Sequence, residues 1–293
     1  MQMFEGFEEK RIVVGDNELY VRLGGSGPSL LLLHGYPQTH AMWHAVAPKL
    51  AERFSLVIPD LPGYGRSSGP LCDPDYRAYS KRTTAQTMAD LMTQLGHRKF
   101  RLAGHDRGAR VAFRLCLDHP ERVEKYAALD IIPTLDMWEG LNADKALAGY
   151  HWQFLAVSAP VPETLIGKDP DFYLEHLLRR WAGNFDGLTT EALADYRTAF
   201  RKSEVIHATC NDYRAGASID RADDQASRDA GSQIACPVHV IWGEGYLNRR
   251  AGSPIEAWRR WTNKISETPL RCGHFVAEEQ PDACARAMLG FFE

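Results

Sequence analysis

Short apolar runs alternate with longer amphipathic stretches through the first 130 residues of the chain. Such runs, as at residues 30–33, are typical of buried strands in a parallel sheet, and the stretches between them have helical periodicity. This alternation predicts βαβ units and a mostly parallel central sheet flanked by helices, an α/β fold. The predicted strands are 11–14, 18–23, 30–33, 56–58, 100–103 and 123–129, and the predicted helices are 41–53, 83–95 and 108–117.

The alternation stops near residue 133 and resumes after Cys236 and Pro237. Residues 133–232 contain helical or irregular segments rich in Trp, Tyr and charge, with no strand of the earlier kind. Beyond them we predict strand 238–242, helix 254–261, a strand near 265–270 and helix 281–292. The chain is therefore predicted to have a core of residues 1–132 and 233–293 and an inserted helical cap, or lid, of residues 133–232.

Composition limits the class of protein. The 293 residues are 44% hydrophobic and 25% charged, with a net charge of −4, as in an ordinary globular protein. This charge argues against a nucleic-acid partner, and every apolar run is far shorter than the roughly 20 residues of a membrane span. The first ten residues lack the basic and apolar regions of a signal peptide, so a cytoplasmic location is expected.

Neither the cysteines nor the histidines predict a metal site. Six cysteines are scattered without a C-x-x-C pair, which favours free core thiols over a disulfide framework. His40 and His44 have the i, i+4 spacing of a zinc pair, but the segment lacks the Glu of H-E-x-x-H and a third ligand nearby.

Polar residues gather where the predicted strands end. Asp106 follows the strand at 100–103, Asp130 follows the strand at 123–129, and His274 follows the last strand. Because ligands bind at the carboxyl ends of parallel strands, two acids and a histidine are expected at one edge of the sheet.

Asp106 lies in Gly104-x-Asp106-x-Gly108, the spacing of a nucleophile elbow. The glycines are needed because a tight strand-to-helix turn leaves no room for side chains there, and the helix N-terminus stabilises a carboxylate. An aspartate that only caps the helix would fit this motif alone. With His34-Gly35 before it and Gly273-His274 after it, a nucleophile is favoured.

Two cations follow the acid. Arg107 and Arg110 lie in the first helical turn, where a positive charge opposes the helix dipole at a cost of about 0.3–1 kcal/mol each. Their i, i+3 spacing places them on one face of the helix, so we expect them to bind a substrate carboxylate rather than to be solvated surface residues. Arg114 is expected to be structural.

Seven motifs resemble the α/β-hydrolase superfamily and, within it, the fluoroacetate dehalogenases over nearly the whole chain. They are H-G-Y-P at 34–37, D-L-P-G-Y-G at 60–65, G-H-D-R-G-A-R at 104–110, L-D-I at 129–131, Y-H-W at 150–152, D-Y-R-A-G at 212–216, and Ser253 with G-H-F at 273–275.

The resemblance implies roles for individual residues. Asp106 would be the nucleophile, His274 the general base and Asp130 the acid that orients it. Arg107 and Arg110 would bind the substrate carboxylate. The cap residues His151, Trp152 and Tyr213 would form the halide pocket, and Trp181 would line the same cavity. Tyr36, where the family often has Phe, would complete an oxyanion hole through its backbone N–H, together with that of Arg107.

The chemistry agrees with these roles. A carboxylate displaces halide from an sp³ carbon, and water deprotonated by histidine then hydrolyses the resulting ester. The expected ligand is a small haloacid, fluoroacetate among them, with no cofactor. The resemblance also implies that homodimers occur, although no segment of the sequence indicates an interface. Glu244 follows the strand after which this family usually places the orienting acid, so it competes with Asp130.

Other functions remain open at this point. An epoxide hydrolase shares the nucleophile and needs cap tyrosines, for which Tyr213 with Tyr150 or Tyr173 would serve. The paired arginines count against a neutral epoxide, and Arg107 stands where haloalkane dehalogenases commonly have Trp. Asp106 at the elbow excludes a serine esterase. A non-catalytic protein that binds small acids is a further alternative. The presence of Asp106, Asp130 and His274 together argues against it, because binding alone does not need all three. The cap aromatics and His151 also fit simple packing roles.

Overall fold

The computed structural model describes residues 3–71, 73–247 and 253–293, and its centre is one eight-stranded sheet. The strand order is β1-β2-β4-β3-β5-β6-β7-β8. The strands are β1 (Glu8–Val14), β2 (Asn17–Gly24), β3 (Ser29–Leu33), β4 (Ser55–Pro59), β5 (Phe100–His105), β6 (Val123–Leu129), β7 (Val238–Gly243) and β8 (Ile265–Leu270).

The sheet is mostly parallel. Only β2 runs antiparallel to its neighbours β1 and β4, and the five pairs from β4 to β8 are parallel. The chain moves outward from β3 to β4 and then returns to place β5 on the other side of β3. Such a switch point opens a crevice at the carboxyl ends of the strands, and here it lies between β3 and β5.

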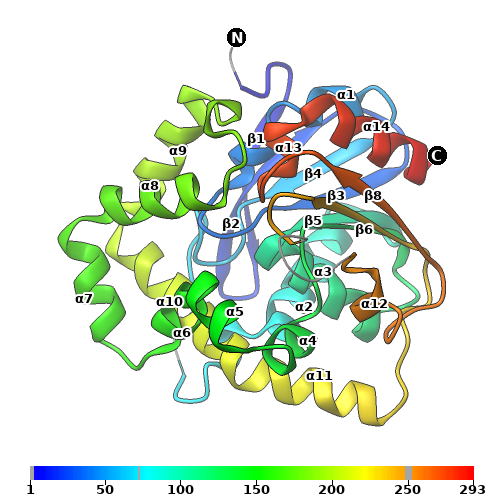
Figure 1. The fold of residues 1–293 in the computed structure, drawn as a ribbon. Coiled ribbons are helices and arrows are strands. Elements are labelled where there is room, and N and C mark those ends of the chain that lie inside the picture. The colour runs from blue at the N-terminus through cyan, green and yellow to red at the C-terminus, as the bar shows by residue number, and fades with distance from the viewer. Residues whose placement is uncertain (1–2, 72, 248–252) are drawn as a thin grey trace.

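Helices cover both faces of the sheet because its central strands are apolar and buried. Figure 1 shows α1, α13 and α14 on one side, and α2, α3 and α12 on the other. These helices are α1 (Ala47–Ala51), α2 (Lys81–Gln94), α3 (Asp106–Asp118), α12 (Ile255–Trp258), α13 (Val276–Glu279) and α14 (Pro281–Phe292). Short 3-10 turns lie at η1 (His40–Trp43) and η2 (Arg77–Tyr79).

A helical insert lies between β6 and β7. Its helices, coloured green to yellow in Figure 1, gather beside the sheet. They are α4 (Thr134–Glu139), α5 (Ala143–Ala148), α6 (Tyr150–Ala156), α7 (Val161–Lys168), α8 (Pro170–Trp181), α9 (Thr190–Phe200), α10 (Ser203–Ala217) and α11 (Ile219–Asp229), with a 3-10 turn η3 (Phe185–Gly187). The predicted α/β fold with an inserted helical region is confirmed.

Two predicted helices are wrong in their extent. The stretch 41–53 divides into η1 and α1, because Pro48 in the first turn of α1 has no N–H to donate to a preceding carbonyl. The predicted helix 254–261 is reduced to α12, which starts after Pro254. The helix at 281–292 and the strand at 123–129 are found with the predicted bounds.

The cysteines of the described residues are free and buried: Cys116, Cys210, Cys236, Cys272 and Cys284. Cys72 lies outside the described residues. No helix in the described part of the chain is long and apolar enough to cross a membrane.

The packing of α3 against β3 leads to a prediction about Gly108. A methyl group at Gly108 would lie 2.2 Å from the carbonyl oxygen of His34, so the backbone would have to shift. We expect Gly108→Ala to lower the free energy of unfolding by about 2–3 kcal/mol. Gly290→Ala is the matched control, because nothing lies within 4 Å of a methyl group there, and helix propensity predicts a gain of about 0.5–1 kcal/mol. Urea unfolding followed by circular dichroism measures both, and equal midpoints would contradict the close approach.

Candidate active site

Asp106 occupies the sharp turn from β5 into α3. Its φ of 45° is in the left-handed region, which is unfavourable for a residue with a side chain. The turn is tight because a methyl group at Gly104 would lie 2.6 Å from the carbonyl oxygen of Gly108. The two glycines of the motif therefore permit the turn, and the turn presents the Asp106 carboxylate at the N-terminus of α3.

The carboxylate of Asp106 has one oxygen held and the other free to react. Its Oδ1 accepts a hydrogen bond of 2.9 Å from the backbone N–H of Tyr36, in the loop after β3. Its Oδ2 lies 3.8 Å from Nε2 of His274. The Tyr36 amide is thus where the resemblance places an oxyanion donor.

His274 is oriented by Asp130. Its Nδ1 lies 2.5 Å from Oδ2 of Asp130, whose Oδ1 accepts a 2.8 Å bond from the N–H of Gly243. Because Asp130 accepts at Nδ1, the imidazole presents the lone pair of Nε2 toward Asp106. Glu244, the competing candidate, is exposed, so the structure brings Asp130 to the imidazole.

The charges of these groups suit nucleophile and base. Burial opposes ionisation of Asp106, but His274, His105 and the arginines outweigh it and lower the pKa of the carboxyl. Burial lowers the pKa of His274 to about 4, against the opposing pull of Asp106. At neutral pH the site therefore combines a charged carboxylate with a neutral imidazole.

Arg107 is buried, and two of its guanidinium nitrogens bind Asp212. Its Nε lies 2.5 Å from Oδ2 of Asp212, and its Nη2 donates to the Asp212 carbonyl at 2.8 Å. Despite burial, Asp212 raises the pKa of the guanidinium. Its Nη1 is buried and has no hydrogen-bond partner among the described residues. This N–H group is therefore available to a ligand or a water molecule.

Arg110 is also buried but has no carboxylate in its hydrogen bonds. Its Nη1 donates to the carbonyl of Ile132 at 3.0 Å and to the hydroxyl of Thr134 at 3.3 Å, while its buried Nε has no partner in the described chain. The guanidinium lies 4.5 Å from the ring centre of Trp152. Burial and the neighbouring charge of Arg107 lower its pKa to about 10, so the group is charged at pH 7.

The predicted cap residues converge on the same place. His151 and Trp152 come from α6, Trp181 ends α8, and Tyr213 comes from α10. The ring of Trp181 lies 4.5 Å from that of His151 and 5.7 Å from that of His274. Tyr213 lies 5.5 Å from Trp152, and the guanidinium of Arg107 lies 4.2 Å from its ring.

Three polar atoms of these cap side chains are buried without a partner in the described residues. They are Nδ1 of His151, Nε1 of Trp181 and the hydroxyl of Tyr213. Burial raises the pKa of Tyr213, so its phenol keeps its proton and can donate. Because buried polar groups are normally paired, these atoms indicate space for a small polar ligand.

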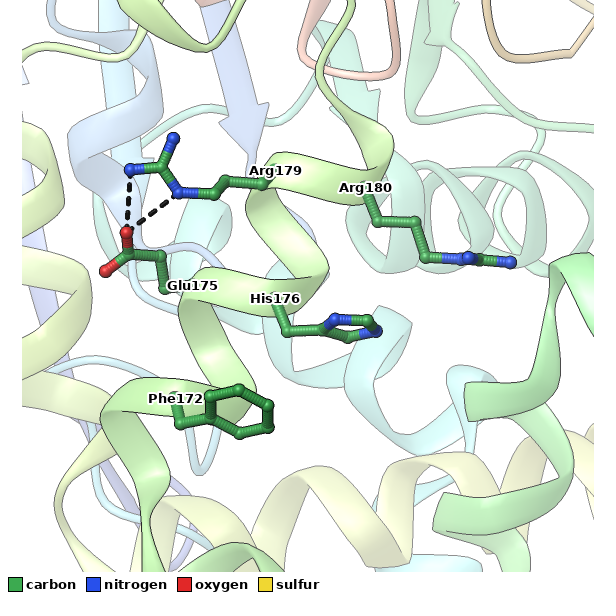
Figure 2. Close-up of a pocket in the computed structure, with 5 residues that line it drawn as sticks. All are labelled: Phe172, Glu175, His176, Arg179 and Arg180. Carbon is green, nitrogen blue, oxygen red and sulfur yellow. Dashed lines mark hydrogen bonds and ion pairs between the residues drawn. The ribbon is translucent and has the colours of Figure 1, made fainter.

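Two cavities lie beside the helical insert, and only one of them has residues of the predicted site in its lining. A cavity of about 330 Å³ has His151, Trp152 and Tyr246 in its lining, whereas Asp106, the two arginines and His274 are not among its lining residues. A second hollow, of about 580 Å³, lies beside α8. Figure 2 shows the side chains of α8 that line it, among them Arg179, which pairs with Glu175 on the same helix. None of the predicted site residues lines that second hollow.

Four further residues around the site were not predicted. Asp212 binds Arg107, and the ring of Tyr246 lies 4.4 Å from that of His274 at an angle of 37°. His105 and Glu279 contact the loop of His274. Asp212 and His105 lie inside quoted motifs, which was the available signal, whereas nothing in the local pattern marks Tyr246 or Glu279.

No cluster of three or more His, Cys, Asp or Glu suited to a metal ion is found among the described residues. Nδ1 of His40 lies 2.9 Å from Oδ1 of Asp60, and Nδ1 of His44 lies 2.9 Å from the carbonyl oxygen of Ala41.

This fold, with an acid at the elbow and a His–Asp pair beside it, defines a hydrolase of the α/β type. The alpha/beta hydrolase fold profile matches residues 28–281, and the chain belongs to this family. A fluoroacetate dehalogenase from Burkholderia sp is 43% identical over 290 residues, which is 99% of this chain and 95% of that protein. Within the family, the chain is a hydrolase of the dehalogenase and epoxide hydrolase group.

Two other similar proteins are also described as hydrolases. A soluble epoxide hydrolase from Corynebacterium sp. (strain C12) is 32% identical, covering 92% of this chain and 91% of that protein. A crystal structure of an alpha/beta hydrolase from Nostoc sp PCC 7120, provisionally assigned as such, has a TM-score of 0.97 and 45% identity, covering 99% of each chain.

The ion pairs of Asp212 lead to a stability prediction. Asp212 also binds the buried Lys81, and together Arg107 and Lys81 overcome burial and lower the pKa of Asp212 to about 2. Asp212→Asn leaves Arg107 without its counterion and Lys81 with only Asp220, 3.4 Å away, so we expect a loss of about 3–5 kcal/mol in the free energy of unfolding. Asp171→Asn, which breaks an exposed pair with Arg201, should cost less than about 1 kcal/mol. Chemical denaturation decides, and similar losses in both variants would refute a buried network.

Proposed function

We propose that this protein is a haloacetate dehalogenase that converts fluoroacetate and water into glycolate and halide. One observation carries the proposal: Arg107 and Arg110 each have a buried N–H group without a partner, beside an ionised Asp106. Two unsatisfied guanidinium groups fit a small carboxylate, the group that distinguishes a haloacid from a neutral haloalkane or epoxide. The Burkholderia relative supports the same substrate class.

The first step needs no base. With Oδ1 held by the Tyr36 amide, Oδ2 of Asp106 attacks the carbon that bears the halogen. The new C–O bond forms as the carbon–halogen bond breaks, and the halide leaves with the bonding pair. The substrate carboxylate, paired with the arginines, holds the carbon in line with Oδ2.

The second step uses His274. Its neutral Nε2 takes a proton from water, and the hydroxide attacks Cγ of the Asp106 ester. The Tyr36 amide stabilises the negative charge that develops on Oδ1. The bond from Cγ to the product oxygen then breaks, that oxygen takes the proton from His274, and Asp106 loses a proton to water to regain its charge.

The cap donors act on the departing halide. Fluoride is a poor leaving group and a strong hydrogen-bond acceptor, so donors placed where its charge develops lower the barrier. The phenol of Tyr213 and the ring N–H groups of His151, Trp152 and Trp181 are available for this role. The substrate is a small molecule. A cytoplasmic location and a homodimer, both expected from the sequence, stay predictions.

Epoxide hydrolysis is the second candidate. The hydroxyls of Tyr213 and Tyr173 are both buried without a partner in the described chain, and a proton donor to an epoxide oxygen needs such hydroxyls. The Corynebacterium relative supports this activity. Against it, a neutral epoxide would leave the free N–H groups of Arg107 and Arg110 unsatisfied, which costs about 1–3 kcal/mol for each.

The test is incubation with fluoroacetate, with release of free fluoride and glycolate as the expected result. Fluoroacetamide, which lacks the negative charge, should react at least about 10-fold more slowly, because hydrogen bonds to a charged partner contribute about 1.5–3 kcal/mol. Asp106→Ala should abolish turnover, and His274→Asn should trap the ester, seen as a mass increase on the peptide that contains Asp106. Turnover of styrene oxide without halide release from any haloacetate would favour the epoxide hydrolase.

The low pKa of His274 predicts the pH dependence of ester hydrolysis. Below its pKa of about 4 the imidazole is protonated and accepts no proton, so the rate should be constant from neutral pH down to about 5 and fall below it. The charge of Asp106 raises this pKa and is absent from the ester, so the midpoint should not exceed that of the free enzyme. Rapid-quench mass spectrometry of the intermediate measures it. A midpoint near 6.5, the ordinary value for histidine, would contradict a buried neutral base.

A further inference from the structure

A single carboxylate binds both sides of the loop that carries His274. Glu279, at the end of α13, accepts a 2.9 Å bond from the N–H of Gly273 on Oε2 and a 3.1 Å bond from the N–H of Phe275 on Oε1. These are the two residues that flank His274. The same Oε2 accepts 2.8 Å bonds from the N–H groups of Gly183 and Asn184, which follow Trp181 in the helical insert.

The backbone of His274 itself is held by the neighbouring elements. Its N–H donates to the carbonyl of Trp181 at 2.9 Å. Its carbonyl lies 2.9 Å from Nε2 of His105, and since a carbonyl only accepts, Nε2 carries the proton. Residues 273–275, here called the base loop, are therefore held by two elements: His105 binds them from the turn that carries Asp106, and Trp181 binds them from the insert.

The insert and the base loop touch backbone to backbone. A methyl group at Gly183 would lie 2.6 Å from the N–H nitrogen of Gly273, and one at Gly273 would lie 2.1 Å from the nitrogen of Gly183. Four N–H groups thus converge on one carboxylate in a nearly closed space, because Glu279 is 7% exposed. No neutral side chain supplies so many acceptor sites at once.

We propose that Glu279 is a positioning residue: it aligns His274 for hydrolysis of the ester and ties that loop to the insert segment that carries Trp181. The proposal rests on the proposed function, since it assigns a residue to the second step. Glu279 touches neither substrate nor the reacting atoms. It acts through the backbone, and its negative charge also raises the pKa of His274, an effect that Glu279→Asp keeps and Glu279→Gln removes. Alkylation of Asp106 needs no base, so only ester hydrolysis depends on the alignment of His274.

The test is Glu279→Gln, which keeps the size of the side chain but places an NH₂ donor against at least one backbone N–H. In single-turnover experiments we expect ester formation to change by less than about 3-fold and ester loss to slow by about 10- to 100-fold, as for a small misplacement of a catalytic group. The ester should then accumulate during turnover, visible by intact-mass spectrometry.

Glu278→Gln is the matched control. Glu278 lies on the same helix, is equally buried and binds the side chains of Gln38 and Tyr196 instead of the base loop. Burial raises its pKa to about 8, so near neutral pH the acid is mostly protonated and glutamine imitates it. We expect less than about 3-fold change in either step.

Glu279→Asp decides the question if the glutamine variant does not fold. It keeps the charge but is one methylene shorter, so ester loss should lie between the wild-type and glutamine rates. Equal slowing of ester formation and ester loss in the Glu279 variants, or the same behaviour as Glu278→Gln, would overturn the proposal. If His274→Asn forms no ester at all, the proposed function fails instead. If His274→Asn traps the ester and the Glu279 variants hydrolyse it normally, only the positioning role fails.

Discussion

The site depends on keeping one buried carboxylate charged. Asp106 sits in a strained turn inside the protein, where burial alone would favour its neutral form. Its ionisation is maintained by the N-terminus of α3, by the Tyr36 amide and by the two arginines of the same helix turn. In the proposed mechanism Asp106 attacks only when it is charged, so the tight turn, the glycines and the cations all serve one electrostatic requirement.

The arginines must keep Asp106 charged and still be able to bind the proposed substrate carboxylate. The carboxylate of Asp212 neutralises the charge of Arg107, whereas Arg110 donates its hydrogen bonds to uncharged oxygens. Arg110 is therefore the cation that remains to balance Asp106. Each arginine also keeps a buried N–H group without a partner in the described residues, and we propose that the substrate carboxylate accepts from these groups. Because a carboxylate pairs with only one of the two guanidinium groups, both cations stay in place and part of their hydrogen-bonding capacity is left for a ligand.

Local pattern was sufficient to predict the strands, the tight turn at Asp106 and the meeting of Asp106, Asp130 and His274 at one edge of the sheet. Each of these depends on residues close in sequence or on the rule that the carboxyl ends of parallel strands share one edge. Local pattern failed for residues 41–53, where Pro48 interrupts the helical pattern. It also missed the contact of Asp212 with Arg107, 105 positions apart, and the contacts of Glu279 with the insert. Such contacts follow from how the insert folds back over the sheet, which no spacing along the chain encodes.

The separation of His274 and Asp106 follows from the choice of nucleophile. A serine would need a direct hydrogen bond to the imidazole, since it attacks only after losing its proton. In the proposed mechanism Asp106 attacks without first losing a proton and needs no such bond, in agreement with the 3.8 Å between its Oδ2 and Nε2 of His274, which is beyond a hydrogen bond. The lone pair of the imidazole then stays available for the water of the second step. In the proposed mechanism the placement of the imidazole matters only at that step, so the proposed role of Glu279 predicts an effect on ester hydrolysis alone.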